Sequence, residues 1–226
     1  MVVNFIILYN EQQFSIIEEK VLGTPESIGN LFCCFSLLER KTSELYHELG
    51  LKFDQPAIKR KMVTIKQDSL KHCNLFKKLS KGLIKKPPTE KRCKRSLGET
   101  WKHVDDITKL IKKTESLSEE DCFMLINRLA FLEHSLGEEY STLEKMKMLT
   151  YMHDEISEKY GIDISSQKEV LESIITDEKQ HTRYLFEIFE ILKKKSKKPD
   201  SQPEFKYQNP DAWLTPSHTQ KFEQII

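Results

Sequence analysis

Five residues that can bind metal ions interrupt the apolar faces of four predicted helices. Hydrophobic residues recur every three or four positions in each helix, a spacing that keeps their side chains on one face. Near its middle each face turns polar, at Glu39, at His72, at Glu133, and at Glu178 with His181. A carboxylate without a counter-charge loses several kcal/mol of solvation inside a bundle, so this cluster requires cations or protons.

A pair of divalent metal ions would neutralise these carboxylates. Hard carboxylate oxygens suit iron or manganese, imidazole adds a borderline ligand, and a glutamate that bridges two ions holds them close together. Glu178 and His181 are three residues apart on one helix face, the spacing of the Glu-x-x-His element of dinuclear carboxylate bundles. The sequence therefore predicts a buried metal site, with iron as the first choice and manganese or zinc as alternatives.

On these residues the chain resembles the rubrerythrin-like branch of the ferritin-like family, over residues 25–195. The matching residues are Glu39, His72, Glu133, Glu178 and His181. An internal repeat agrees with the resemblance, because Leu38-Glu39 followed by Glu44 and Tyr46 recurs 94 positions later as Leu132-Glu133 followed by Glu138 and Tyr140. Such a repeat indicates two copies of a helical hairpin, in which each tyrosine is expected to hydrogen-bond the opposing metal ligands.

The second helix departs from the pattern that the resemblance implies. Ser69 stands where Glu-x-x-His would place a glutamate, and the nearest acid, Asp68, is four residues before His72. Asp68 is the sixth candidate ligand, although its side chain is short for a bridging role. Three outcomes remain open: a full dinuclear site that uses Asp68, an asymmetric or single-metal site, or a remnant that no longer binds metal.

Four long helices are expected to position these residues. Helix start and stop signals predict helices over 25–49, 55–80, 118 to about 149, and 165–195. The stretch 81–117 contains Pro87-Pro88, a basic cluster and one shorter amphipathic pattern, which predicts a long crossover with an accessory helix. An all-α fold with its long crossover between the second and third helices is typical of a ferritin-like four-helix bundle.

Three segments make up the predicted domain organisation. Residues 1–23 form an N-terminal extension without an assigned role, and the bundle occupies 24–195, with an extra helical turn or two expected within 152–160. Residues 196–226 are polar and hold four of the eight prolines, so we expect an extended or disordered C-terminal tail.

Composition and charge exclude several classes of protein. Glycine accounts for only 7 of 226 residues, which favours helices over turn-rich sheets. Lys+Arg number 36 against 35 Asp+Glu, a net charge of +1, so we expect no nucleic-acid partner. The basic cluster from Lys77 to Arg95 is interpreted as a solvated loop.

The cysteines and the apolar runs bear on the cellular location. The five cysteines include no C-x-x-C pair, which excludes a rubredoxin-like or zinc-ribbon module. Their odd number favours a reducing compartment, and Cys33-Cys34 is interpreted as core filling. The longest apolar run considered, Leu31 to Leu38, is far shorter than the ~18 residues that span a bilayer. The apolar segment at the chain start lacks the basic region and the small-residue cleavage site of a signal peptide. We therefore expect a cytoplasmic protein that makes no membrane contact.

Two functions fit the sequence. The resemblance implies an oxidoreductase of the peroxidase or ferroxidase type, with a di-iron, manganese or mixed centre that acts on peroxide, dioxygen or ferrous iron. It would draw electrons from an external donor protein and form a homodimer. The alternative is a non-catalytic helical scaffold or interaction protein with a degenerate metal site.

Overall fold

The computed structural model describes residues 25–114, 116–145 and 165–196. Within these ranges the chain is all-helical. The helices are α2 (Pro25–Leu51), α3 (Pro56–Ser80), α4 (Glu90–Lys113), α5 (Glu119–Lys145) and α7 (Ser165–Lys195). The predicted all-α fold is confirmed, and α2 continues two residues beyond its expected end. The N-terminal extension, the extra turns within 152–160 and the tail beyond Ser196 lie outside the described residues.

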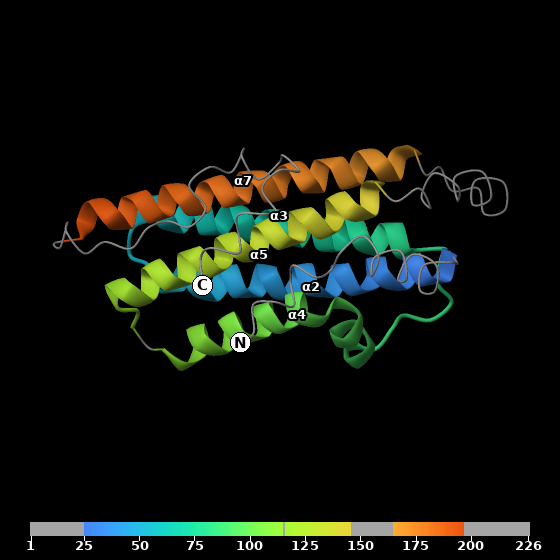
Figure 1. Cartoon of the computed structure of the whole chain (residues 1–226), viewed down its shortest axis with the longest axis horizontal. Coiled ribbons are helices and arrows are strands. Elements are labelled where there is room, and N and C mark those ends of the chain that lie inside the picture. Colours follow the sequence, from blue (N-terminus) through green and yellow to red (C-terminus); the bar gives the residue numbers. More distant parts are fainter. Residues whose placement is uncertain (1–24, 115, 146–164, 197–226) are drawn as a thin grey trace, which may run out of the picture.

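Two helical hairpins lie side by side in the bundle (Figure 1). Helix α2 packs most extensively against α3, and α5 packs most extensively against α7. Helices α2 and α7 run in one direction along the bundle, whereas α3 and α5 run in the other. Because α3 and α5 are parallel, the chain has to return along the whole bundle between them, and α4 lies in this return.

Helix α4 is the accessory helix expected within the crossover. Its N-cap is Thr89, whose side chain accepts a hydrogen bond from the backbone N–H of Arg92. Gly98 interrupts it with a φ of 46°, a left-handed conformation that glycine adopts without steric cost. The helix contacts both α2 and α5, so it packs against both hairpins.

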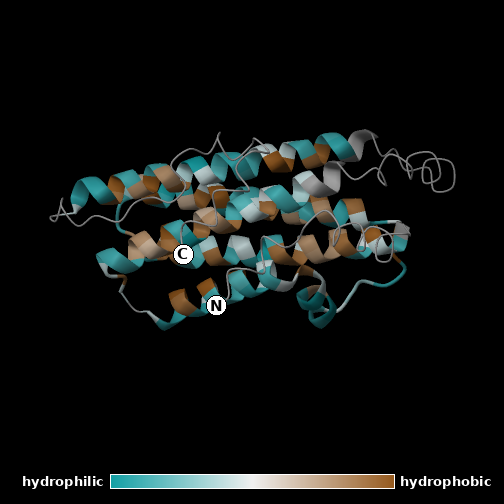
Figure 2. Cartoon of the chain, viewed as in Figure 1, coloured by the Kyte–Doolittle hydropathy of each residue, from teal (hydrophilic) through white to brown (hydrophobic). Residues whose placement is uncertain are grey.

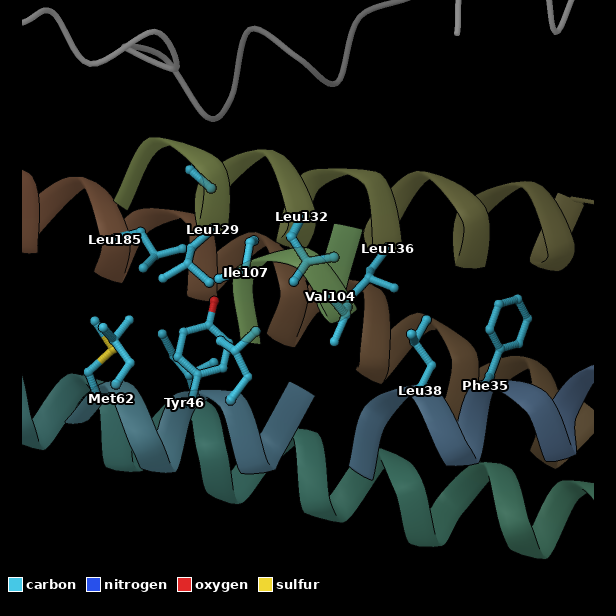
Figure 3. Packing of buried hydrophobic residues seen from close by; sticks show 14 of the residues in the cluster. Phe35, Leu38, Tyr46, Met62, Val104, Ile107, Leu129, Leu132, Leu136 and Leu185 are labelled. Carbon is cyan, nitrogen blue, oxygen red and sulfur yellow. The ribbon is translucent and has the colours of Figure 1, made fainter. Parts of the chain in front are cut away.

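Apolar side chains fill the space that the helices enclose. Brown, hydrophobic segments alternate with teal, hydrophilic ones along each helix (Figure 2), as expected for helices that bury one stripe. Leu38 of α2, Leu132 and Leu136 of α5, and Val104 of α4 point into a common interior (Figure 3). Each such side chain, when fully buried, contributes about 1.5–3 kcal/mol to the free energy of unfolding.

The start of α5 confirms the helix signal at Ser118. The Ser118 hydroxyl accepts a hydrogen bond from the backbone N–H of Asp121 at 3.1 Å. In return, the Asp121 carboxylate accepts one from the Ser118 backbone N–H at 3.1 Å. This reciprocal cap satisfies two backbone donors that a helix start leaves without partners. It therefore holds the point at which the crossover ends and the second hairpin begins.

A disulfide joins Cys34 of α2 to Cys93 of α4. Both cysteines are buried, and the interpretation of Cys33-Cys34 as core filling is therefore wrong for Cys34. Disulfides are more usual in oxidising compartments, in contrast to the compartment expected from the cysteine count. No helix in the described part of the chain combines the length and apolarity that a membrane span requires.

Candidate metal centre

Five of the six predicted site residues meet in the middle of the bundle. Glu39 comes from α2, His72 from α3, Glu133 from α5, and Glu178 with His181 from α7, and each is at most 2% exposed. All five lie on the apolar faces of their helices, so packing of the faces brings them together. Burial on this scale removes water from groups that ordinarily keep it, and the cluster has to supply its own counter-charges.

The five residues form two triads that share one glutamate. One triad is Glu39, His72 and Glu178, and the other is Glu133, Glu178 and His181; within each, one ligand atom per residue lies within 4.8 Å of the others. Glu178 Oε1 is 3.0 Å from His72 Nδ1, and Glu178 Oε2 is 3.4 Å from His181 Nδ1. Each oxygen of Glu178 thus faces a different histidine, the arrangement of a carboxylate that bridges two metal ions.

Several candidate ligand atoms in this cluster make no hydrogen bond of good geometry within the described residues, although the two Glu178 oxygens lie 3.0 and 3.4 Å from histidine nitrogens. They are Glu39 Oε2, His72 Nδ1 and both carboxylate oxygens of Glu178. A buried polar atom without a partner costs about 1–3 kcal/mol, and more when it is charged. Metal ions would satisfy these atoms at once, because carboxylate oxygens and imidazole nitrogens are ligands for iron, manganese and zinc. The residues present therefore fit a pair of metal ions.

Two tyrosines link the hairpins reciprocally, as the repeat predicted. The Tyr46 hydroxyl of α2 donates a hydrogen bond to Glu133 of α5 at 2.5 Å. The Tyr140 hydroxyl of α5 donates one to Glu39 of α2, also at 2.5 Å. Burial and the neighbouring glutamates raise the pKa of both tyrosines well above its ordinary value. Both hydroxyls therefore stay protonated and act as donors that orient the terminal carboxylates.

Asp68 does not join the ligand atoms. It lies outside both triads, and its carboxylate is 3.3 Å from Nε2 of His181, the ring nitrogen that faces away from the glutamates. The side chain is 30% exposed. A carboxylate in this place fixes the tautomer and the orientation of a metal-binding imidazole. The structure thus places the sixth predicted residue behind a ligand rather than among the ligands.

Asp177 has the matching position behind His72, and the sequence analysis did not find it. Its carboxylate is 3.1 Å from His72 Nε2 and 2.8 Å from Lys71 Nζ. A signal was available, because Asp177 precedes His181 by four residues, as Asp68 precedes His72. Each aspartate therefore lies one helical turn before the histidine of its own helix and supports the histidine of the other.

The two histidines are strongly basic in the metal-free centre. Burial alone would lower the pKa of His72, but the carboxylates of Asp177, Glu178 and Glu39 outweigh it and raise the pKa to about 11. His181 behaves alike, since Glu178, Asp68 and Glu133 overcome burial and raise its pKa well above the ordinary value. Two imidazolium groups thus offset part of the negative charge of the centre when metal is absent, and metal binding has to displace their protons.

The net pKa shifts of Glu133 and Glu178 run in opposite directions, although burial acts on both in the same sense. Burial and the charge of Glu178 raise the pKa of Glu133 to about 7, although His181 opposes them. Burial and Glu39 would also raise the pKa of Glu178, but His181 and His72 lie on either side of it and lower the pKa. Glu178 is accordingly more firmly ionised than Glu133, which suits a carboxylate shared by both triads.

In comparisons with known proteins, no protein-family model, no curated protein and no solved structure matches the chain significantly.

Proposed function

We propose that the protein binds a pair of redox-active metal ions and belongs with the ferritin-like, rubrerythrin-like carboxylate bundles. The observation that carries this proposal is the position of Glu178, whose two oxygens face the two histidines and whose carboxylate is common to both triads. A salt bridge with a purely structural role does not require one carboxylate to contact two histidines in this way. The parallel α3 and α5 and the long crossover support the ferritin-like assignment.

The reaction we propose is reduction of peroxide or dioxygen, or oxidation of ferrous iron. Bound iron or manganese would supply the change of oxidation state and an open coordination position. Glu39, His72, Glu133, Glu178 and His181 would hold the ions, and Tyr46 and Tyr140 would keep the terminal carboxylates in place. Because every one of these residues is almost fully buried, bulk water is kept from the reacting atoms.

The proposed reduction cycle requires electrons from another protein. A rubredoxin-like donor needs pairs of C-x-x-C cysteines, and the sequence contains no such pair. We therefore place the reductant outside this chain.

Metal stoichiometry tests the proposal directly. The metal-free protein is titrated anaerobically with Fe(II) or Mn(II), and bound metal is measured by elemental analysis. We expect about two ions per chain and stabilisation that grows with metal concentration. Glu178→Gln should abolish binding of the pair, since it removes the bridging charge. Glu172→Gln, an exposed glutamate on the same helix, is the matched control and should bind normally.

The catalytic part of the proposal has its own readout. Admitting dioxygen or peroxide to the Fe(II)-loaded protein should oxidise the iron faster than in an equal solution of free Fe(II), and Glu178→Gln should lose this acceleration. Absence of metal binding in the parent protein would contradict the proposal and favour the helical scaffold. Binding without acceleration would confine the function to metal storage or structure.

A further inference from the structure

Nine exposed lysine and arginine residues gather toward one end of the bundle, where α3 ends and α4 begins (Figure 1). The stretch that holds them, from Lys77 to Arg95, contains a single acid, Glu90. Because the whole chain has a net charge of only +1, this end is far more positive than the rest of the molecule. We call the surface the basic end; its residues are Lys77, Lys78, Lys81, Lys85, Lys86, Lys91, Arg92, Lys94 and Arg95.

Most of the basic end lies on helices rather than in the connection between them. Six of its nine residues belong to the last turns of α3 or the first turns of α4. The connection is held against α2, because a β-carbon on Gly29 would lie 2.6 Å from that of Leu83. The Cys34–Cys93 disulfide fixes the first turn of α4 to α2 as well. Packing therefore determines where these positive charges lie.

The charges of the basic end are mostly unpaired. Lys94 has two ion pairs, at 3.4 Å to Glu90 and at 3.4 Å to Asp105. The other residues of the basic end form no ion pair with an acid in the described part of the chain. Like charges on neighbouring side chains repel one another, and an anionic surface that covers them relieves the repulsion. The basic end thus has the electrostatic character of a surface that meets an acidic partner.

The basic end begins close to the candidate metal centre. Lys77 follows His72 on α3 at a distance of about 8 Å along the helix axis. Between them, Phe76 is fully buried, and its ring centroid lies 5.0 Å from that of Tyr140. The Tyr140 hydroxyl in turn donates a hydrogen bond to Glu39. A short series of packed aromatic side chains therefore leads from this surface to a candidate ligand.

We propose that the basic end is the docking surface for an acidic protein that carries single electrons, such as a small iron–sulfur protein. This inference rests on the proposed function, which needs an external reductant, and adds the charge of that partner and the place where it docks. Each reduced carrier gives up one electron and leaves oxidised, so two carriers return two Fe(III) ions to Fe(II). A nucleic acid fits less well, because the stretch 77–95 has no aromatic side chain on which bases could stack.

Docking is measured first on the metal-free full chain, so that its outcome does not depend on the metal pair. The probe is an acidic two-iron ferredoxin, and calorimetry gives the affinity at several concentrations of NaCl. We expect a one-to-one complex whose affinity falls steeply as the salt concentration rises, since salt screens exposed charges.

Charge reversal identifies the surface that binds. Lys91→Glu/Arg92→Glu changes two exposed residues at the start of α4 and should weaken ferredoxin binding by at least about ten-fold. Lys59→Glu/Arg60→Glu makes the same change in charge near the start of α3, at the other end of that helix, and should bind as the parent does. Acidic residues are favourable near helix starts, so both variants should fold.

Electron delivery is measured on iron-loaded protein that has been oxidised to Fe(III). At low salt, reduced ferredoxin should reduce the iron at least about ten-fold more slowly in Lys91→Glu/Arg92→Glu than in the parent or in the control variant. Reduced methyl viologen, a small cation that needs no docking surface, should reduce all three at similar rates.

Several results would overturn the inference and leave the proposed function intact. They are absence of ferredoxin binding, binding that salt does not weaken, equal binding by the two charge-reversed variants, and tighter binding of duplex DNA than of ferredoxin. Docking that does not accelerate reduction of iron that methyl viologen reduces would also overturn it. Failure of the parent to bind two iron ions would overturn the proposed function and the inference together.

Discussion

The α2–α3 hairpin and the α5–α7 hairpin supply nearly the same chemistry but are held in the molecule differently. Each contributes a terminal glutamate, a tyrosine, a histidine and an aspartate to the centre. Only α2 is joined to α4 by a disulfide, between Cys34 and Cys93, whereas among the described residues α5 meets α4 through noncovalent contacts. The two hairpins therefore present matching buried side chains while their attachment to α4 differs.

The surroundings also differ behind the two histidines. The hydrogen bond with His72 and the charge of Lys71, whose Nζ lies 2.8 Å from the Asp177 carboxylate, lower the pKa of that carboxyl to about 2. The counterpart of Lys71 at the 109-residue offset is Gln180, which has no charge. The aspartate behind His72 is thus held by an ion pair that the other half of the centre does not repeat.

Breaking the disulfide should produce the largest difference in local stability between the two hairpins. The double variant Cys34→Ser/Cys93→Ser opens a loop of 59 residues, which should lower the free energy of unfolding by about 4 kcal/mol. Hydrogen exchange should show loss of protection in α4 and α2 before α7. Cys122→Ser, which removes an unpaired buried thiol of α5, is the control. Equal loss of protection in α7 would contradict the idea that the disulfide serves the α2 side alone.

Alkaline pH should weaken the metal-free protein and leave the metal-loaded form less affected. The pKa of His72 rises from 6.5 to about 11 on folding, so its stabilisation is complete below pH 6.5 and is lost as the pH rises toward 11. Between pH 7 and pH 9 the loss should approach about 3 kcal/mol. Metal ions require neutral imidazole, so binding should strengthen over the same range.

Denaturant unfolding at several pH values measures this effect. His72→Gln, which does not titrate, should remove the part of the dependence that His72 contributes and leave the part that His181 contributes, whereas His47→Gln at an exposed position should change neither part. A metal-free protein with constant stability from pH 7 to pH 9 would contradict the basicity of His72.

The aspartates test whether the ion pair at Lys71 matters for metal binding. Removing a carboxylate behind a ligating histidine typically weakens metal binding by about 10–100-fold. We expect Asp177→Asn near the upper end of this range and Asp68→Asn near the lower, because Asp177 has the shorter bond and the lysine partner. Competition with a chromogenic chelator gives both affinities, and Asp106→Asn on α4 is the control. The reverse order would show that Lys71 competes with His72 instead of supporting it.

Removing either tyrosine hydroxyl should give the smallest difference in stability between the hairpins, since the two hydrogen bonds to glutamate are equal in length. Tyr46→Phe and Tyr140→Phe should each lower the free energy of unfolding by about 1–2 kcal/mol, as the partner carboxylates lose a buried donor. The two effects should agree within about 0.5 kcal/mol. Tyr184→Phe, which is only partly buried, should change little. Clearly unequal effects would mean that the hairpins are less alike than the offset of 94 suggests.

The helices and the ligand residues were predictable because both follow from local periodicity. Glu39, His72, Glu133, Glu178 and His181 stand out as polar residues on apolar faces, and each face has to be buried wherever its helix packs. The reciprocal tyrosine bonds were predictable for a similar reason, since the repeat relates one hairpin to the other. Here the sequence prediction is confirmed by the hydrogen bonds of Tyr46 and Tyr140.

The position of Asp68 was not predictable in the same way. Its spacing of four from His72 places it on the side of α3 that carries the histidine, but spacing within a helix does not say which residue of the next helix it meets. The contact with His181 depends on how α3 and α7 pack, and so does the matching contact between Asp177 and His72.

By itself, the sequence determined that the protein is helical, that four of its helices carry glutamate or histidine side chains inward, and that position 69 lacks a carboxylate. These properties depend on residue types and on spacings of three and four, which an α-helix converts directly into a face. Only the tertiary structure decided that Glu178 belongs to both triads, that each aspartate contacts the histidine of the other helix, and that Cys34 reaches Cys93. Each of these contacts joins residues far apart in the chain, and their distances are determined by the packing of whole helices rather than by any local pattern.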